Sequence, residues 1–237
     1  MAYTYEYPRP GCSVDIVVFG IHQHSSDTPE LQVLLVERRN DPFKGWHALP
    51  GGYVNATDEG DKGEDIEAAA YRELMEETGI RPARLEQVCT MGKPERHPLH
   101  RVISVVYTAF VRLADHKVVA GDDAKEASWS SVRDALSTKG LAFDHNEMLR
   151  AAYERLCLKV RHEPIGLDLM PPAFPLSNLR ALYEAILMRK LDHASFRQSI
   201  LATNILKEAA MHGDVRLYRF NTRAYDEAAR EGLFLRL

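Results

Sequence analysis

The chain has 237 residues and a mass of 26.8 kDa, and its 45% of hydrophobic residues can form one large core or two ordinary ones, which excludes a disordered tail. Lys and Arg number 30 against 34 Asp and Glu, so the net charge is −4 and contact with nucleic acid requires a local basic patch. Apolar runs such as 17–20 and 102–106 are far shorter than the roughly 20 residues of a membrane-spanning helix, and the first residues, MAYTYEYPRPG, lack a signal-peptide pattern. We therefore expect a soluble, cytoplasmic protein.

Hydrophobic periodicity places several strands around one helix in the first two thirds of the chain. The expected strands are 13–19, 32–38, 85–91, 101–113 and 127–129, and the expected helix is 64–79. Only a polar loop separates the first two strands, so we expect them to be neighbours in the sheet. Strands flanking a central helix indicate an α/β or α+β fold.

The three cysteines, Cys12, Cys89 and Cys157, are an odd number, lie far apart and have no histidine at a zinc-like spacing. None has a flanking base or a helix start that lowers a thiol pKa. We expect reduced cysteines packed in the core.

A second long helix is expected to open at Asp144, with Glu147 three residues later at capping-box spacing. The following segment, 161–175, holds four prolines, which end the helix and predict a linker. We therefore expect two domains, residues 1–163 and residues 164–237. The first carries 20 basic and 26 acidic residues, a net charge of −6, and the second carries 10 and 8, a net charge of +2.

Two short helices and two short strands are expected after the linker. Ser177 and Asp192 are the predicted N-caps of the helices, and the strands ILKE and VRLYRF are joined through a turn at Gly213. This order is typical of a winged helix-turn-helix domain, whose second helix contacts base edges in a major groove. The outward-facing candidates for such contacts are Ser195, Arg197, Gln198 and Asn204. The alternative is a small packing or dimerisation domain.

Three carboxylates crowd one face of the helix expected at 64–79. Glu73 and Glu77 are four residues apart, and Glu76 is three residues from Glu73. Like charges at this spacing repel, so the arrangement favours a bound cation, and oxygen ligands of this kind suit Mg²⁺, with Mn²⁺ as a substitute. Arg72 is adjacent and can clamp one carboxylate. The alternative is an acidic face exposed to solvent.

The same segment resembles the signature of the Nudix family. That signature is a glycine, five residues, a glutamate, seven residues, and then Arg-Glu-apolar-x-Glu-Glu-x-Gly-apolar. The matching residues are Glu64, Arg72, Glu73, Leu74, Glu76, Glu77, Gly79 and Ile80. One departure is that Gly52 lies 12 positions before Glu64 where the signature has six, so the segment NATDEGDKG contains an insertion of about six residues.

The resemblance implies an α/β/α sandwich that acts on a pyrophosphate linked to a nucleoside. It implies that the side chains of Glu73, Glu76 and Glu77, with the backbone carbonyl of Gly51, hold the metal. The implied catalytic residues are Glu76, Glu77, Glu126 and Arg72. The implied chemistry is attack by metal-activated water, with the metal also stabilising charge on the phosphate oxygens.

Two further stretches, GKPERHPLHRVISVVY and AGDDAKEASW, resemble Nudix domains that handle ADP-ribose. This resemblance implies that Arg96 and Arg101 pair with the pyrophosphate or orient the terminal ribose, as a guanidinium fork allows. Trp46 and His47 precede the LPGG segment and can stack on a base, and Gly52 is expected at the ligand. The alternatives are solvated arginines and a tryptophan that only packs.

The join of the two halves, including FPLSNLRALYEAILMRKLDHASFRQ, resembles Nudix-related transcriptional regulators of NAD metabolism and their sugar-responsive relatives. The resemblance implies a homodimer whose Nudix domains bind ADP-ribose or a related NAD-derived nucleotide and whose winged helices bind double-stranded operator DNA. The expected wing, 209–214, lacks Lys and Arg, which weakens the expected DNA contact. The alternatives are a Mg²⁺-dependent pyrophosphohydrolase of ADP-ribose or sugar nucleotides with a dimerising tail, and a metal-free scaffold.

Overall fold

The computed structural model describes residues 6–7, 9–22, 29–56, 63–113, 124–138, 140–163, 165–167, 169–232 and 235. The chain divides into two compact units. Unit 1 comprises 1–19, 33–109 and 116–152, and unit 2 comprises 20–32, 110–115 and 153–237. No helix within the described ranges is long and apolar enough to cross a membrane.

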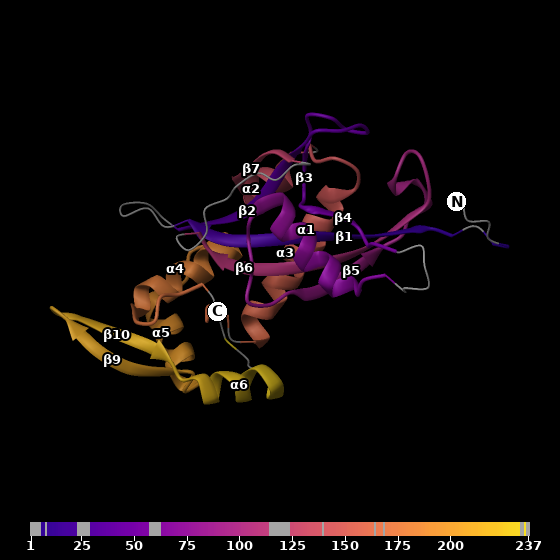
Figure 1. Ribbon diagram of the computed structural model, residues 1–237. Helices are drawn as coiled ribbons and strands as arrows, with labels where there is room; N and C mark the ends of the chain where they lie inside the picture. Colours follow the sequence, from indigo (N-terminus) through magenta and orange to yellow (C-terminus); the bar gives the residue numbers. More distant parts are fainter. Residues whose placement is uncertain are drawn as a thin grey trace. The chain divides into compact units, whose positions relative to one another are not determined.

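A seven-stranded sheet runs through the first two thirds of the chain (Figure 1). Its strands are β1 (Gly11–His22), β2 (Glu30–Arg38), β3 (His47–Ala48), β4 (Gly51–Tyr53), β5 (Glu86–Met91), β6 (Val102–Arg112) and β7 (Ala124–Ser131). The order is β3-β2-β1-β6-β5, with β4 paired to β1 and β7 paired to β2. All five predicted strands are confirmed, and the first two are neighbours. The very short β3 and β4 were not predicted.

The helix that carries the carboxylates is α1 (Ile66–Thr78). It begins where the side chain of Asp65 accepts a hydrogen bond from the backbone N–H of Glu67, and it ends at Gly79. Its buried residues are Ala69, Ala70, Leu74 and Thr78. Because these residues share one face, the charged residues between them remain available to solvent and to the site.

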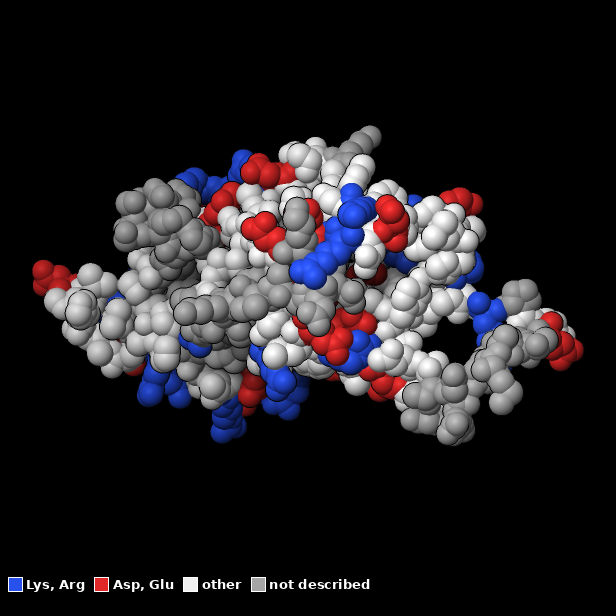
Figure 2. Space-filling view, turned by 45° about the horizontal axis from the view of Figure 1, so that its top comes forward, with Lys and Arg blue, Asp and Glu red and all other residues white. Residues whose placement is uncertain are grey.

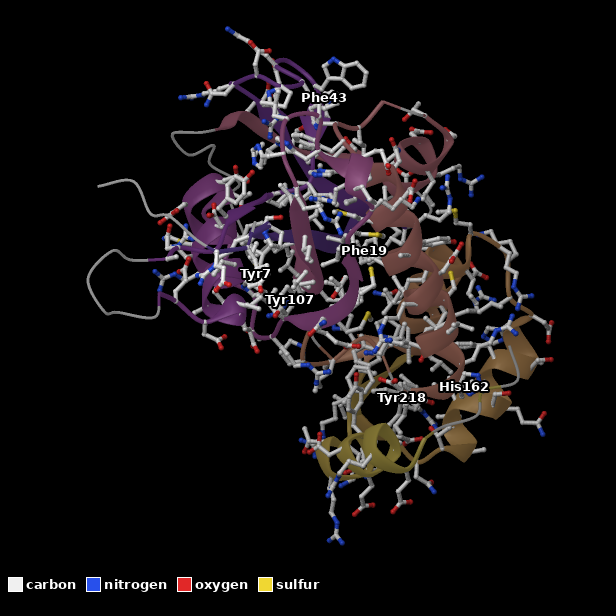
Figure 3. All side chains as sticks on the ribbon, turned by 90° about the vertical axis from the view of Figure 1, so that its right-hand side faces the viewer. Tyr7, Phe19, Phe43, Tyr107, His162 and Tyr218 are labelled. Carbon is white, nitrogen blue, oxygen red and sulfur yellow. The ribbon has the colours of Figure 1, made fainter. Side chains whose placement is uncertain are left out.

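Two further helices follow β7, the short α2 (Val132–Ser137) and the long α3 (His145–His162). α1 and α3 lie on opposite sides of the sheet, which gives the expected α/β/α sandwich (Figures 1 and 3). α3 begins where predicted, but the Asp144 carboxylate does not serve as the predicted cap. Its two oxygens accept hydrogen bonds from Arg96, while its backbone carbonyl accepts one from the N–H of Glu147.

Residues 174–231 of unit 2 form a small sheet with three short helices. The elements are β8 (Phe174–Pro175), α4 (Leu176–Leu187), α5 (His193–Ala202), β9 (Leu206–His212), β10 (Val215–Phe220) and α6 (Thr222–Glu231), with strand order β8-β10-β9. The two predicted helices and the hairpin are confirmed. The strand β8 and the helix α6 were not predicted.

Two details of this part correct the sequence-based expectations. The N-cap of α4 is Pro175 rather than Ser177, because the chain passes into the helix directly from β8. β8 lies in the proline-rich segment, which is tolerated because it is an edge strand. The three cysteines are free, as expected, but they are half-buried rather than core residues.

Candidate functional site

One guanidinium holds the carboxylates around α1 together. Arg72 donates to Glu64 through Nε at 3.0 Å and through Nη2 at 2.5 Å. Its Nη1 donates to Glu73 at 2.8 Å and to Glu76 at 3.0 Å, and its Nη2 donates to the Tyr53 carbonyl at 3.1 Å. The bonds to Glu64 raise the pKa of Arg72 and lower the pKa of Glu64. Arg72 therefore clamps the carboxylates, as expected, and ties α1 to β4.

Two glycines bring the backbone against carboxylates of α1. The N–H of Gly51 donates to Glu77 Oε2 at 2.9 Å. A Cβ added at Gly52 would lie 2.5 Å from the carboxylate of Glu73, so a larger residue at this position would displace that carboxylate. Burial raises the pKa of Glu73, while the hydrogen bond and the charge of Arg72 act in the opposite direction. The Glu73 carboxylate is therefore half-buried and already paired with one cationic side chain.

The donor atoms at this place are of the kind that Mg²⁺ and Mn²⁺ bind. Glu73, Glu77 and Gly51 border one cavity and offer carboxylate and carbonyl oxygens. Glu76 is exposed and is held by Arg72. Within the part of the chain that the structure describes, no three His, Cys, Asp or Glu side chains gather closely enough to hold a metal ion. The donor chemistry fits a divalent cation, and the grouping of all three glutamates around one remains a prediction.

A cavity of about 460 Å³ opens beside α1 in unit 1, large enough for a nucleotide-sized ligand. The charged residues of its wall are Asp15, Glu73, Glu77, Arg38, Arg39 and Arg96. Both signs of charge therefore line the same space. Figure 2 shows basic and acidic side chains next to one another around a recess on the face that it presents.

A buried polar network borders the cavity. His145 Nδ1 accepts a hydrogen bond from the N–H of Leu49 at 2.9 Å, so the ring proton is on Nε2, which lies 3.3 Å from Asp15 Oδ1. Ser104 Oγ donates to the other oxygen of Asp15. Burial lowers the pKa of His145 and keeps its ring neutral.

Arg96 belongs to the same network. Its Nε and Nη2 donate to the two oxygens of Asp144 at 3.0 and 2.9 Å, and Nη2 lies 3.7 Å from Asp15 Oδ2. Its side chain is only 5% exposed. Arg96 therefore lines the cavity, as expected, but its guanidinium is committed to carboxylates of the protein.

Arg72 and Glu76 belong to the ion-pair cluster of α1 and do not line the cavity, and four further residues expected at the site do not line it either. Arg101 is exposed and donates to the Gly92 carbonyl at 2.5 Å. Trp46 is 46% exposed and packs edge-on against a neighbouring phenylalanine. His47 and Glu126 are also exposed. The structure thus does not bring these four residues together with Glu73 and Glu77.

The sequence pattern does not single out several residues of the cavity wall, among them Asp15, Arg38, Arg39, Phe143 and His145. Asp15 had a usable signal, because it is the one charged residue in the apolar strand segment 13–19 and a buried charge requires partners. His145 had none, because its bond to Leu49 joins residues 96 positions apart.

Residues 57–62, at the centre of the insertion after Gly52, lie outside the described residues. Their flanks are tied together, since the Glu64 N–H donates to the Asn55 carbonyl at 3.0 Å. The Asn55 N–H in turn donates to Glu64 Oε1 at 2.8 Å. The insertion therefore leaves the start of α1 in place.

The second candidate site is α5 in unit 2. Asp192 caps this helix, as predicted, by accepting from the Ser195 N–H at 2.9 Å, and this bond lowers the pKa of Asp192. The residues expected to face outward, Ser195, Arg197, Gln198 and Asn204, are all exposed. Asn204 lies just beyond the end of α5. Arg197 Nη1 lies 3.4 Å from the hydroxyl of Tyr218 on β10, so α5 contacts the hairpin.

The hairpin of β9 and β10 carries its positive charge on its strands. Residues 209–214 contain no Lys or Arg. Lys207 and Arg219 lie directly opposite each other across the two strands, and both are exposed. Like charges at this spacing repel, so the pair favours an anionic partner.

The chain matches two family models. The NUDIX domain covers residues 12–152, and the NrtR DNA-binding winged helix domain covers residues 166–220. The chain is also 33% identical over 226 residues to the ADPR responsive transcriptional repressor NtrR of Acinetobacter baylyi, across 93% of this chain and 86% of that relative.

Two solved structures of Shewanella oneidensis NrtR are similar to this fold. The complex with a 27mer DNA has a TM-score of 0.72 at 28% identity and covers 91% of this chain and 95% of that one. The complex of its NUDIX domain with ADP ribose has a TM-score of 0.54 at 32% identity and covers 63% and 90%. The chain therefore belongs to the Nudix family, in the branch where an NrtR-type winged helix domain follows the Nudix domain.

Proposed function

We propose that this protein is an ADP-ribose-responsive transcription repressor. Its Nudix domain binds ADP-ribose or a closely related NAD-derived nucleotide, and its winged helix binds operator DNA. The observation that carries this proposal is the presence in one chain of a charged, nucleotide-sized cavity beside α1 and an exposed α5. The similar proteins, a repressor responsive to ADP-ribose and NrtR complexes with DNA and with ADP ribose, support it.

The charges of the cavity suit a diphosphate. Arg38 and Arg39 offer guanidinium groups to phosphate oxygens. Glu73 and Glu77 would hold Mg²⁺ or Mn²⁺ on the same wall, with Glu76 joining them when it leaves Arg72. A bound cation neutralises part of the diphosphate charge.

The exposed side chains of α5 suit the base edges of a major groove. Arg197 forms bidentate hydrogen bonds best with guanine, and Gln198 with adenine. Because operators of winged helix proteins are read by pairs of helices, we propose a homodimer that presents two copies of α5 to two half-sites. We further propose that it works in the cytoplasm and that the two domains meet at residues 163–164.

The DNA-binding part is tested by fluorescence anisotropy with a duplex from the region upstream of the protein's own gene. We expect Arg197→Ala to weaken binding by about tenfold, and Arg133→Ala, an exposed arginine on α2, to leave it unchanged. Binding of the wild-type protein should also fall steeply with salt. If no salt-sensitive complex forms at low ionic strength, the protein is not a DNA-binding repressor, and residues 164–237 form a packing domain.

Retained hydrolysis of the ligand is a second candidate function, favoured by the complete Nudix signature from Glu64 to Ile80. Arg72 positions Glu73 and Glu76, and the Gly51 N–H positions Glu77. When bound, Mg²⁺ would acidify a water molecule and stabilise charge on the phosphate oxygens, and that water would add across the pyrophosphate bond. The pyrophosphate bond would break to give AMP and ribose 5-phosphate.

The hydrolase is tested by following AMP release from ADP-ribose with Mg²⁺. Glu76→Gln should lower turnover by at least about a hundredfold, because it removes a charged oxygen donor. Glu67→Gln, an exposed glutamate of the same helix, is the matched control and should keep full turnover. Equal turnover in the two variants would remove α1 from the mechanism.

A further inference from the structure

A second hollow, of about 520 Å³, adjoins the ligand cavity in unit 1. It is lined by Glu37, Arg38, Arg39, Lys44 and Gly45. Arg38 and Arg39 also line the 460 Å³ cavity, so the two spaces share a wall. The residues that line the second hollow therefore carry three positive charges and one negative charge, and Lys44 is the one cation among them that does not also line the first cavity.

The loop between β2 and β3 holds these cations in place. The Gly45 N–H donates to the Arg38 carbonyl at 2.9 Å, and the Arg38 N–H donates to the Trp46 carbonyl at 3.0 Å, which closes the loop. Arg38 Nε donates to the Pro42 carbonyl at 2.9 Å. The backbone on either side of Lys44 is therefore ordered before any ligand arrives, which lowers the entropic cost of binding.

An aromatic contact anchors the same loop. Phe43 projects from it (Figure 3), and its ring centroid lies 4.7 Å from that of Phe143. Both residues have positive φ, 67° and 52°, a backbone conformation that persists in phenylalanine only where packing holds it. The guanidinium carbon of Arg38 lies 4.7 Å from the centroid of the Phe143 ring. The wall shared by the two hollows is thus fixed by contacts between segments 100 residues apart in the chain.

We infer that the second hollow is an anion subsite that accepts an additional phosphoryl group of an ADP-ribose-type ligand. This rests on the proposed function, because it extends the same cavity. The diphosphate of ADP-ribose lies between its two riboses, so a phosphate on either ribose is an additional anionic group beyond the diphosphate. Such a group adds about 1.5 to 2 negative charges, which guanidinium forks and the Lys44 ammonium complement. A phosphorylated ADP-ribose therefore binds more tightly than ADP-ribose.

The test measures the affinities of ADP-ribose, ADP-ribose 2′-phosphate and ADP-ribose 1″-phosphate by calorimetry. One phosphorylated ligand should bind the wild-type protein at least about tenfold more tightly than ADP-ribose, and its identity shows which ribose faces Lys44. Lys44→Glu should abolish this gain and leave ADP-ribose binding unchanged, because Lys44 does not line the first cavity. Arg133→Glu, on α2 and away from both hollows, is the control and should keep the gain.

In a protein that binds ADP-ribose, the subsite is wrong if neither phosphorylated ligand gains affinity or if the gain survives Lys44→Glu. The subsite is also wrong if Lys44→Glu weakens DNA binding in the absence of nucleotide, because these cations would then contact DNA phosphates instead of the nucleotide. A second readout does not depend on ADP-ribose. Trp46 adjoins Gly45 and is exposed, so in a Trp129→Phe background its fluorescence should respond saturably to inorganic tripolyphosphate, and Lys44→Glu should remove the response.

The two readouts separate the subsite from the proposed function. A tripolyphosphate response that requires Lys44, without any binding of ADP-ribose, keeps the subsite and overturns the proposed function. Binding of ADP-ribose without a gain for either phosphorylated ligand keeps the proposed function and overturns the subsite. Absence of both signals overturns both.

Discussion

Arg96 and Asp144 form a bidentate ion pair at the edge of the cavity, with Nε and Nη2 of the arginine 3.0 and 2.9 Å from the two carboxylate oxygens. The two side chains are 5% and 10% exposed. The pair joins the short 3-10 helix η1 (Pro94–Arg96) to the start of α3. It therefore fixes one wall of the cavity from two segments that are far apart in the sequence.

Removing one partner of this pair should destabilise the fold. Asp144→Asn leaves the buried guanidinium with only the more distant Asp15, and we expect a loss of about 2 to 4 kcal/mol in the free energy of unfolding. The measurement is urea denaturation with an unchanged m-value. Glu147→Gln breaks an exposed ion pair with Lys93 nearby and should have a much smaller effect. Equal losses in the two variants would show that the Arg96 pair is not a stabilising contact.

His145 predicts a pH dependence of stability. Burial lowers its pKa in the folded protein below the ordinary value of 6.5, so below that pH the unfolded chain binds a proton that the folded chain does not. The stability is therefore complete above about pH 6.5 and declines as the pH falls below it. We expect the melting temperature of the wild-type protein to drop more between about pH 7 and pH 5.5 than that of His145→Gln. Parallel profiles would contradict a neutral, buried His145.

The backbone of Gly52 lies so close to the Glu73 carboxylate that a larger side chain at position 52 should disturb it. A methyl group at this position would lie 2.5 Å from the Glu73 carboxylate, so Gly52→Ala should displace it and weaken Mn²⁺ binding measured by electron paramagnetic resonance. Any ADP-ribose hydrolysis should fall by about a hundredfold, because misplacement by about 1 Å has that effect. Gly92→Ala is the matched control, since its added methyl would meet nothing closer than 4.0 Å. Unchanged Mn²⁺ affinity in Gly52→Ala would show that Glu73 is not a ligand of the metal ion.

We expect the hairpin to contact DNA through the basic side chains of its strands, including Lys207 on β9. The tip of the hairpin has no basic residue, but Lys207 and Arg219 face each other on its strands. Lys207→Ala should weaken binding to all duplexes equally and reduce the slope of log affinity against log salt by about one, which is the signature of one lost phosphate contact. Arg223→Ala, on the exposed face of α6, should keep the slope. A change in sequence preference instead would assign Lys207 to base contacts.

Features with local signals could be predicted from the sequence. The helix α1 was found within two residues at each end because its cap at Asp65 and its end at Gly79 lie next to it in the chain. The exposed face of α5 followed in the same way from its cap at Asp192 and its buried Phe196. The cluster of Arg72 with Glu73, Glu76 and Glu77 could be predicted because these residues lie within two consecutive turns of one helix.

Features that depend on long-range pairing could not be predicted. Arg96 was expected to contact a ligand, but its partner is 48 residues away and only the folded chain brings it close. The two-residue strand β8 forms because Phe174 pairs with Tyr218, 44 positions later, which overrides the proline-rich composition around it. Trp46 and Glu126 stand out in the sequence only by their residue type and their neighbours, and neither property fixes where a side chain lies in the fold.

The measurement that tests the central claim most directly is the affinity of the full chain for its operator duplex with and without saturating ADP-ribose, at one fixed salt concentration. Coupled sites should change this affinity by about fivefold or more, and Gly52→Ala, which disturbs the nucleotide cavity, should reduce the change. An operator affinity that ADP-ribose leaves unaltered, in a protein that binds both ligands, would contradict an ADP-ribose-responsive regulator.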